Sequence, residues 1–294
     1  MQRLLAYLVA LILVGLAAFW LATEPARVDP SAIAGMNGDP VRGERIFYLG
    51  GCASCHAAAG AKGDERLKLS GGLALTSPFG TFYAPNISPD AEFGIGGWST
   101  LDLVNAMHFG TSPDGRHYYP AFPYPSYIRA ELADIVDLKA FLDTLPPVAV
   151  ANQAHEVGFP FNFRRLLGGW NLLFLKPGPV ADASGFSAEA LRGQGMAEGL
   201  GHCGECHTPR GMFGNPEYSK WLQGAPHPSG KGKIPALAGI DWSASDIAEF
   251  LKSGFTPDFD TAGAEMADVI DNTAHLGDAD RAAIAAYLKE ICPN

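Results

Sequence analysis

Basic residues are scarce in this sequence. It has 21 Lys and Arg against 31 Asp and Glu, which gives a formal net charge of −10 at pH 7. A chain with this charge lacks the basic surface that binds nucleic acid, so we expect no nucleic-acid partner. An acidic surface suits docking to basic protein surfaces instead. The chain also lacks the low apolar content of a disordered protein, because 47% of its residues are apolar and 18% are charged. We therefore expect it to fold.

One long apolar run stands at the N-terminus. Residues 4–22, LLAYLVALILVGLAAFWLA, approach the roughly 20 residues that cross a bilayer as a helix. A cleaved signal peptide has a shorter apolar core and a small-residue cleavage site, and no clear site follows this run. We therefore favour an uncleaved signal-anchor over residues 1–24 and a linker over 25–35, with cleavage as the alternative. Arg3 favours a cytoplasmic start, which sends the remaining chain across the membrane.

Cysteine is also scarce, and its positions form a pattern. Four cysteines make two CxxCH motifs and a fifth is left over: Cys52, Cys55, Cys203, Cys206 and Cys292. The two pairs stand too far apart for a zinc ribbon, and no alternating strand-and-helix pattern suggests a thioredoxin-like redox motif. Disulfides or structural cysteine pairs leave the histidine behind each motif unexplained. We expect Cys292 to be a free, partly buried thiol.

Covalently attached haem explains the cysteines, the histidines and their repetition together. Two thiols on one turn of helix add to the two vinyl groups of a haem, and the next histidine then points its imidazole at the iron. The sequence therefore predicts two haem c groups, with His56 and His207 as the proximal iron ligands. In the second motif we expect the carbonyl of Pro209 to hold the ring N–H of His207. The first motif continues as HAAA and lacks that proline.

The two motifs anchor an internal repeat. Three pairs of segments match: 40–56 with 190–207, 98–114 with 242–258, and 130–147 with 276–293. Each pair reads as a helix, and the second pair begins with Trp-Ser and ends with Gly and a turn. The repeat therefore predicts a mainly α fold in which three helices surround each haem.

We place the two haem domains at residues 36–147 and 186–294. The connection between them, 148–185, is rich in proline, glycine and aromatic residues. It is too apolar for a flexible spacer, so we expect it to pack along both domains, with His155 in a structural role.

Longer strings make the chain resemble a known family. They are TFYAPNISPDAEFGIGGWSTLDLVNAM, DGRHYYPAFPYPSY, FPFNFRRLLGGWNLLF and HTPRG, and they resemble the cytochrome c subunit of membrane-bound alcohol, aldehyde and gluconate dehydrogenases. The resemblance runs from about residue 36 to the end. It implies tandem class-I cytochrome c domains in the bacterial periplasm, held at the inner membrane by a single helix. That family usually carries three haem domains, so the two found here favour a two-haem carrier over a quinone-reactive role.

For the second haem, the resemblance places a methionine ligand in the loop between the Trp-Ser helix and the last helix. Met266 is the single methionine in that loop, FDTAGAEMADVIDNTAHL. A thioether ligand stabilises reduced iron and raises the reduction potential. The alternative for Met266 is a plain buried apolar side chain.

The first haem lacks the corresponding methionine. The ungapped alignment sets Phe122 opposite Met266, and a phenylalanine has no lone pair to donate to iron. We favour His117, which lies in the equivalent loop, as the sixth ligand. Met107, on a helix position that should face the distal side, is the weaker candidate, and an iron without a protein ligand is the third possibility. We expect the neighbouring His108 to point elsewhere, into solvent.

These features favour an electron-transfer protein with no substrate of its own. Its donor would be a dehydrogenase subunit or a membrane complex, and its acceptor a soluble cytochrome, an oxidase or a photosynthetic centre. The alternative is a haem enzyme, a peroxidase or small-molecule oxidase acting at an open first haem. No obvious acid–base pair adjoins that site in the sequence, and the two haems should differ in potential.

Overall fold

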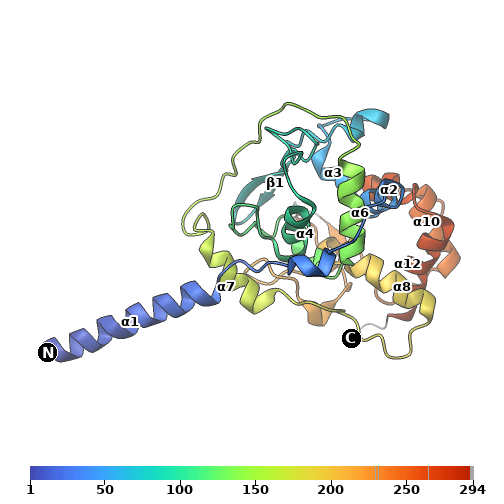
Figure 1. Cartoon of the computed structure of the whole chain (residues 1–294). Coiled ribbons are helices and arrows are strands. Elements are labelled where there is room, and N and C mark those ends of the chain that lie inside the picture. Colours follow the sequence, from blue (N-terminus) through green and yellow to red (C-terminus); the bar gives the residue numbers. More distant parts are fainter. Residues whose placement is uncertain (229, 231, 264, 292–294) are drawn as a thin grey trace.

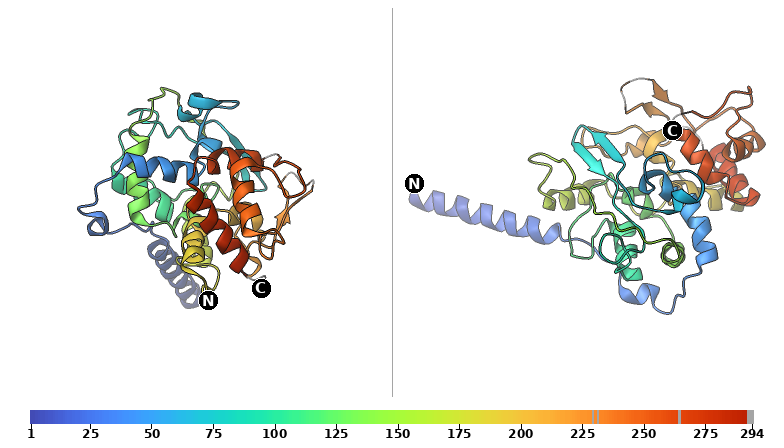
Figure 2. Two further views of the ribbon diagram at one scale, coloured as in Figure 1. Left: turned by 90° about the vertical axis from the view of Figure 1, so that its right-hand side faces the viewer. Right: turned by 90° about the horizontal axis from the view of Figure 1, so that it is seen from above.

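A long helix projects from a body made of two helical halves (Figure 1). We describe a computed structural model of the chain, which covers residues 1–228, 230, 232–263 and 265–291. The projecting helix is α1 (Gln2–Ala22), and none of its residues is buried. Most of the second half lies on the side of the body away from α1 (Figures 1 and 2). The part of the chain that the structure describes contains twelve α-helices, which confirms the mainly α prediction.

Each half is built on three main helices in the positions that the repeat predicts. The first half has α2 (Pro40–Leu49), α4 (Thr100–Phe109) and α6 (Leu132–Leu142). The second half has α8 (Ala188–Glu198), α10 (Ala244–Ser253) and α12 (Asp278–Glu290). In both halves the first of these helices packs against the last, α2 on α6 and α8 on α12.

The Trp-Ser segments start α4 and α10 for the same physical reason. The hydroxyls of Ser99 and Ser243 each accept a backbone N–H three residues on, and the carboxylate there accepts the serine's own N–H in return. This capping box satisfies two backbone donors that a helix end leaves free. Both helices then end at a glycine in the left-handed conformation, Gly110 and Gly254.

Shorter elements complete each half. Two small antiparallel hairpins, β1–β2 and β3–β4, were not expected from the sequence, because strands of two to four residues carry little periodicity. The short elements are η1 (Pro30–Ile33), α3 (Cys52–His56), η2 (Gly63–Leu67), β1 (Ala74–Ser77), β2 (Gly80–Tyr83), α5 (Tyr124–Tyr127), α9 (Gly204–His207), η3 (Tyr218–Lys220), β3 (Ala225–Pro226), β4 (Lys233–Ile234) and α11 (Glu265–Thr273).

The connection between the halves packs along both of them. It pairs with the first half through backbone hydrogen bonds between Glu156 and Thr81 in both directions. It then forms α7 (Arg165–Phe174), which lies beside the end of α1 (Figure 1). Near the end of the connection, the backbone N–H groups of Val180 and Ala181 donate to the buried carboxylate of Glu198 on α8, in the second half.

One hydrophobic core runs through both halves. Ile46, Phe47 and Ile135 from the first half belong to the same buried cluster as Leu200 and Tyr287 from the second. Two independent domains on a tether would each enclose a separate core. The continuous core therefore fixes one half against the other.

The two pairs of packed helices approach so closely that each needs a glycine. A Cβ at Gly43 of α2 would lie 2.0 Å from the carbonyl oxygen of Asp137 on α6. At the equivalent Gly193 of α8, a Cβ would lie 1.8 Å from the carbonyl oxygen of Ala283 on α12. Both neighbours are backbone atoms of a helix, so they have no room to move without shifting the helix axis.

Replacing Gly193 by alanine should destabilise the protein, because α8 and α12 must then move apart. We expect the free energy of unfolding to fall by about 2 kcal/mol, within the usual range for overpacked cores. Gly195 on the same helix is the matched control, since nothing lies within 4 Å of its Cβ position. Gly195→Ala should be neutral or stabilising by up to about 1 kcal/mol. Thermal unfolding of the haem-loaded variants measures both, and equal effects would contradict the close approach.

Candidate haem sites

Each CxxCH motif forms a short turn directly after the first helix of its half. Cys52–His56 is α3, and Gly204–His207 is α9 with Cys203 at its N-cap. Gly51, the residue directly before α3, has a φ of 55°, and His202, the residue directly before Cys203, has a φ of 38°. These left-handed residues turn the chain sharply, so that α2 and α8 each lead straight into a haem-binding turn.

Both proximal histidines are held by a backbone carbonyl. The Nδ1 of His56 lies 2.8 Å from the carbonyl oxygen of Pro85, and the Nδ1 of His207 lies 2.8 Å from that of Pro235. A carbonyl only accepts, so Nδ1 carries the proton and Nε2 keeps the lone pair that iron requires. Burial lowers the pKa of both imidazoles, which also keeps them neutral.

The expectation that Pro209 holds His207 is wrong. The carbonyl of Pro209 accepts the backbone N–H of Glu217 instead. The true acceptors, Pro85 and Pro235, follow the second strands of the two hairpins, β2 and β4. The hairpins are therefore a repeated part of the site that returns a proline to the histidine from 29 and 28 residues away.

No disulfide joins the four described cysteines. Burial raises the pKa of Cys52 and of Cys203 to about 12. Redox-active and metal-binding thiols instead have lowered pKa values, because the thiolate is the reactive form. Because no disulfide joins them, the four sulfurs are available for thioether bonds to haem. Cys292 lies outside the described residues.

A cavity of about 440 Å³ lies beside the first motif. Cys52, Cys55 and His56 all line it, and most of its remaining surface is apolar. The apolar walls include Leu75, Ile95, Trp98, Leu103, Leu138 and Leu142. An apolar slot with two thiols and an imidazole at one edge fits a covalently attached haem.

The structure places Met107 and Phe122 in the wall of this cavity but not His117. The Nε2 of His117 lies 2.9 Å from the carbonyl oxygen of Thr23, just beyond α1, and the ring is buried there. His108 is half-buried against Phe109, so it is not the solvated side chain that we expected, although it does point away from the cavity.

Two further histidines line the cavity. The Nδ1 of His155 accepts the backbone N–H of Tyr83, which leaves the proton on Nε2 and removes the lone pair that an iron ligand needs. Its ring packs against Phe82 and Tyr119, as expected of a structural residue. His202 comes from the second half, directly before Cys203, and was not anticipated because it reaches across to the other repeat.

At the second motif, the ring of Trp221 packs directly on α9. A Cβ at Gly204 would lie 2.0 Å from this ring. The indole Nε1 of Trp221 donates to the hydroxyl of Tyr287, which donates to the buried carboxylate of Glu198. Met266 is the second residue of α11 and packs, half-buried, against the core.

The two haem-binding turns meet at the interface between the halves. The third residue of each motif bonds to the opposite half: Ser54 Oγ accepts from the Asn272 amide at 2.9 Å, and Glu205 accepts from the Ser126 hydroxyl at 2.7 Å. Burial raises the pKa of Cys55, and Asp268 and Cys206 from the second half raise it further.

Contacts around the turns strengthen this interface. Arg45 on α2 forms an ion pair with Asp280 on α12, with 2.5 Å between nitrogen and oxygen. The rings of Tyr48 and His275 stack at 3.9 Å between centroids. Burial raises the pKa of the Glu205 carboxyl, but its ion pair with Arg210 and the hydrogen bond from Ser126 lower it overall, so the group stays charged.

A mainly helical fold with two CxxCH turns, each with a carbonyl-held histidine, defines a c-type cytochrome. Residues 40–146 and 190–291 match the family described as Cytochrome c, and the chain belongs to that family. It carries two covalently attached haem c groups and functions in electron transfer. The resemblance to cytochrome c subunits of dehydrogenases is confirmed.

The relatives are cytochromes and components of dehydrogenases. The chain is 55% identical to a protein described as "Diheme cytochrome c-type" from Cereibacter sphaeroides, over 99% of both chains. It is 37% identical to the cytochrome c subunit of alcohol dehydrogenase (quinone) of Gluconobacter oxydans, over 85% of this chain and 54% of that protein. It is 34% identical to the cytochrome c subunit of gluconate 2-dehydrogenase of Pantoea cypripedii, over 85% of this chain and 59% of that protein. The chain thus spans little more than half the length of these two dehydrogenase components.

Proposed function

We propose that this chain is a membrane-anchored relay in which an electron passes between two haems of the same chain. The reciprocal hydrogen bonds of Ser54 and Glu205 across the interface carry this proposal, because they hold both haem-binding turns against the opposite half. Each haem, when bound, supplies a one-electron iron couple. The protein attaches it through Cys52 and Cys55 in the first half and through Cys203 and Cys206 in the second.

The chain's own residues set the properties of each site. His56 and His207 present Nε2 to the iron while a carbonyl fixes the ring, and the apolar wall of the first cavity excludes water. For the second haem we propose Met266 as the sixth ligand. For the first we propose Met107, which lines the cavity, in place of His117, whose Nε2 is engaged by Thr23.

The membrane and the partners follow from sequence and relatives. α1 is a 21-residue helix of mean hydropathy 2.6, apolar and long enough to cross a membrane. We place it in the inner membrane of a bacterium, with the haem domains in the periplasm. The electron donor is a dehydrogenase, as the names of the relatives suggest, and the acceptor is a soluble cytochrome or terminal complex. The net charge of −10 suits docking to basic partner surfaces.

The methionine assignments predict distinct optical and magnetic changes. Met266→Ala and Met107→Ala should each convert one of the two ferric haems from low spin to high spin, because each removes a strong-field thioether ligand. His117→Ala should leave both haems low spin. Met212→Ala is the matched methionine control, since its side chain is 84% exposed on the surface. Low-temperature EPR of the oxidised protein reports the spin state.

A high-spin signal in His117→Ala, with no change in Met107→Ala, would contradict the Met107 assignment and favour His117 as the sixth ligand of the first haem. A high-spin signal in the unmodified protein would mean an open iron. That outcome would favour the haem-enzyme alternative, which peroxide turnover by the purified protein tests independently.

The relay itself predicts that dehydrogenase substrates reduce both haems in membranes. Membranes from a bacterium deleted for this gene and complemented with the full chain should show reduction of haem c with an alcohol or gluconate. If electrons enter at the first haem, a Cys203→Ser/Cys206→Ser variant without the second haem should lose substrate-driven oxygen uptake while its first haem is still reduced. If electrons enter at the second haem, a variant without the first haem should lose oxygen uptake while its second haem is still reduced. Cys292→Ser is the control that keeps both haems. Oxygen uptake that stays unchanged when one haem is removed, whichever haem it is, would contradict the relay.

A further inference from the structure

Helix α7 turns an apolar face to solvent. Leu166 and Leu173, two turns apart on the helix, are both exposed, and Leu173 is 73% exposed. The opposite face is the packed one, because Gly168 is buried against Thr23 and Asn171 accepts a hydrogen bond from the hydroxyl of Tyr124. An apolar face on a helix that is already anchored on its other side marks a surface that binds something.

Neighbouring segments extend this face. The approach to α7 contributes exposed Phe159, Phe161 and Phe163, of which Phe159 is 87% exposed. The second half adds exposed Met212 and Phe213. We call these residues, together with Leu166, Leu172 and Leu173, the apolar patch.

Two contacts connect the second-half part of the patch to α7. The indole Nε1 of Trp170 donates to the carbonyl oxygen of Phe213, and the rings of Phe174 and Phe213 lie 6.1 Å apart. The patch is therefore one surface built by the connecting segment and the second half.

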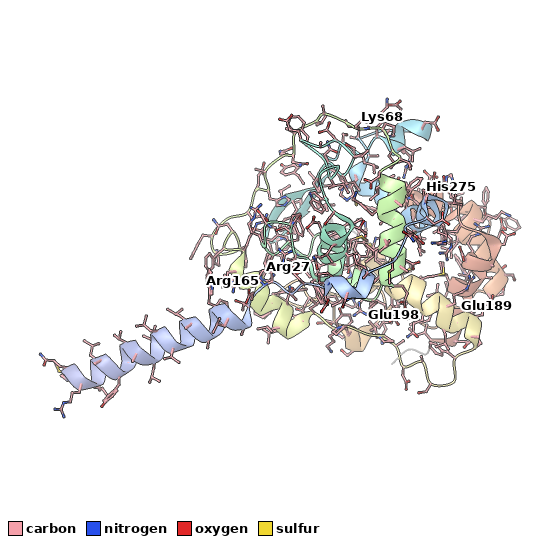
Figure 3. All side chains as sticks on the ribbon, viewed as in Figure 1. Arg27, Lys68, Arg165, Glu189, Glu198 and His275 are labelled. Carbon is pink, nitrogen blue, oxygen red and sulfur yellow. The ribbon has the colours of Figure 1, made fainter. Side chains whose placement is uncertain are left out.

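The apolar patch is continuous with the end of α1. Arg165 lies where α1 meets the body (Figure 3). Its guanidinium lies over the ring of Trp20 at 4.3 Å, and its Nε donates to the hydroxyl of Thr23 at 3.0 Å. A Cβ at Gly169 would meet the ring of Phe19 at 3.4 Å. The N-terminal turn of α7 therefore sits where the apolar helix α1 ends.

The charge of this segment differs from that of the chain. Residues 157–181 contain Arg164, Arg165 and Lys176 but no Asp or Glu, although acidic residues outnumber basic ones by 31 to 21 overall. Basic residues flanking an apolar helix face, with Trp, Phe and Leu on that face, are typical of helices that lie in a membrane interface. The positive charges of such basic residues complement the anionic headgroups of a lipid surface.

We propose that the apolar patch lies in the headgroup region of the bilayer that α1 spans, so that α7 is a second membrane contact. This rests on the proposed membrane anchor, because α1 brings the patch to the lipid surface. A single helix leaves the body free to swivel about the linker. A second contact fixes the body, with the first half towards the membrane and most of the second half away from it (Figures 1 and 2).

Nitroxide accessibility in lipid nanodiscs tests this. The full chain, in a Cys292→Ser background with haem oxidised, receives one labelled cysteine at a time in discs of phosphatidylethanolamine and phosphatidylglycerol. Leu173→Cys is the test position, with Leu166→Cys as a second. Val41→Cys on α2 is the matched control, since Val41 is 76% exposed. Leu13→Cys reports on α1 itself. An unchanged haem spectrum shows that each variant folds.

We expect collisions with oxygen to be favoured over collisions with a water-soluble nickel complex at Leu13, Leu166 and Leu173, and the reverse at Val41. The oxygen-to-nickel ratio at Leu173 should be several-fold higher than at Val41. If Leu13 is in lipid but Leu166 and Leu173 match Val41, the patch does not touch the membrane and is left for a protein such as the dehydrogenase. If Leu13 also matches Val41, the membrane anchor itself fails.

Discussion

Two reciprocal hydrogen bonds hold each haem-binding turn against the opposite half of the molecule, and the arrangement of the site depends on them. Ser54 and Glu205 occupy the same place in their motifs, between the two cysteines, and each bonds to a residue of the other repeat. The core continues across this boundary, and the Arg45–Asp280 ion pair closes it at α2 and α12. A duplicated cytochrome domain thereby becomes one body in which the haem-binding turns have a fixed relation.

Within that fixed frame the two sites differ in chemistry. Both proximal histidines are held in the same way, by the carbonyl of a proline that follows a small hairpin. The differences lie at the proposed sixth-ligand positions: Phe122 and Met107 line the first cavity, while Met266 stands in the second half. Axial ligands and their surroundings set haem potentials. In the proposed relay, unlike sites in a rigid pair would give an electron a preferred direction along the chain.

The parts of this structure that local chemistry decides were accessible from the sequence. The CxxCH spacing, the Ser99 and Ser243 helix starts and the repeat itself all act over a few residues or through self-similarity. Contacts between residues far apart in the chain were not accessible from the sequence. Pro235 rather than Pro209 holds His207 because a hairpin returns it from 28 residues away, and His117 contacts Thr23 because the segment after α1 folds back on the first half. No local pattern distinguishes these alternatives.

The proposed relay requires that the two haems lie close together in a fixed orientation across the interface between the halves. Circular dichroism in the Soret region measures this most directly, because two nearby haems in a fixed relation couple their transitions. We expect a bisignate Soret signal that collapses to a single sign when the first haem is removed by Cys52→Ser/Cys55→Ser. The spectrum of the Cys203→Ser/Cys206→Ser variant, which keeps only the first haem, completes the comparison. If the spectrum of the intact protein equals the sum of the spectra of the two single-haem variants, the proposed fixed relation between the haems is contradicted.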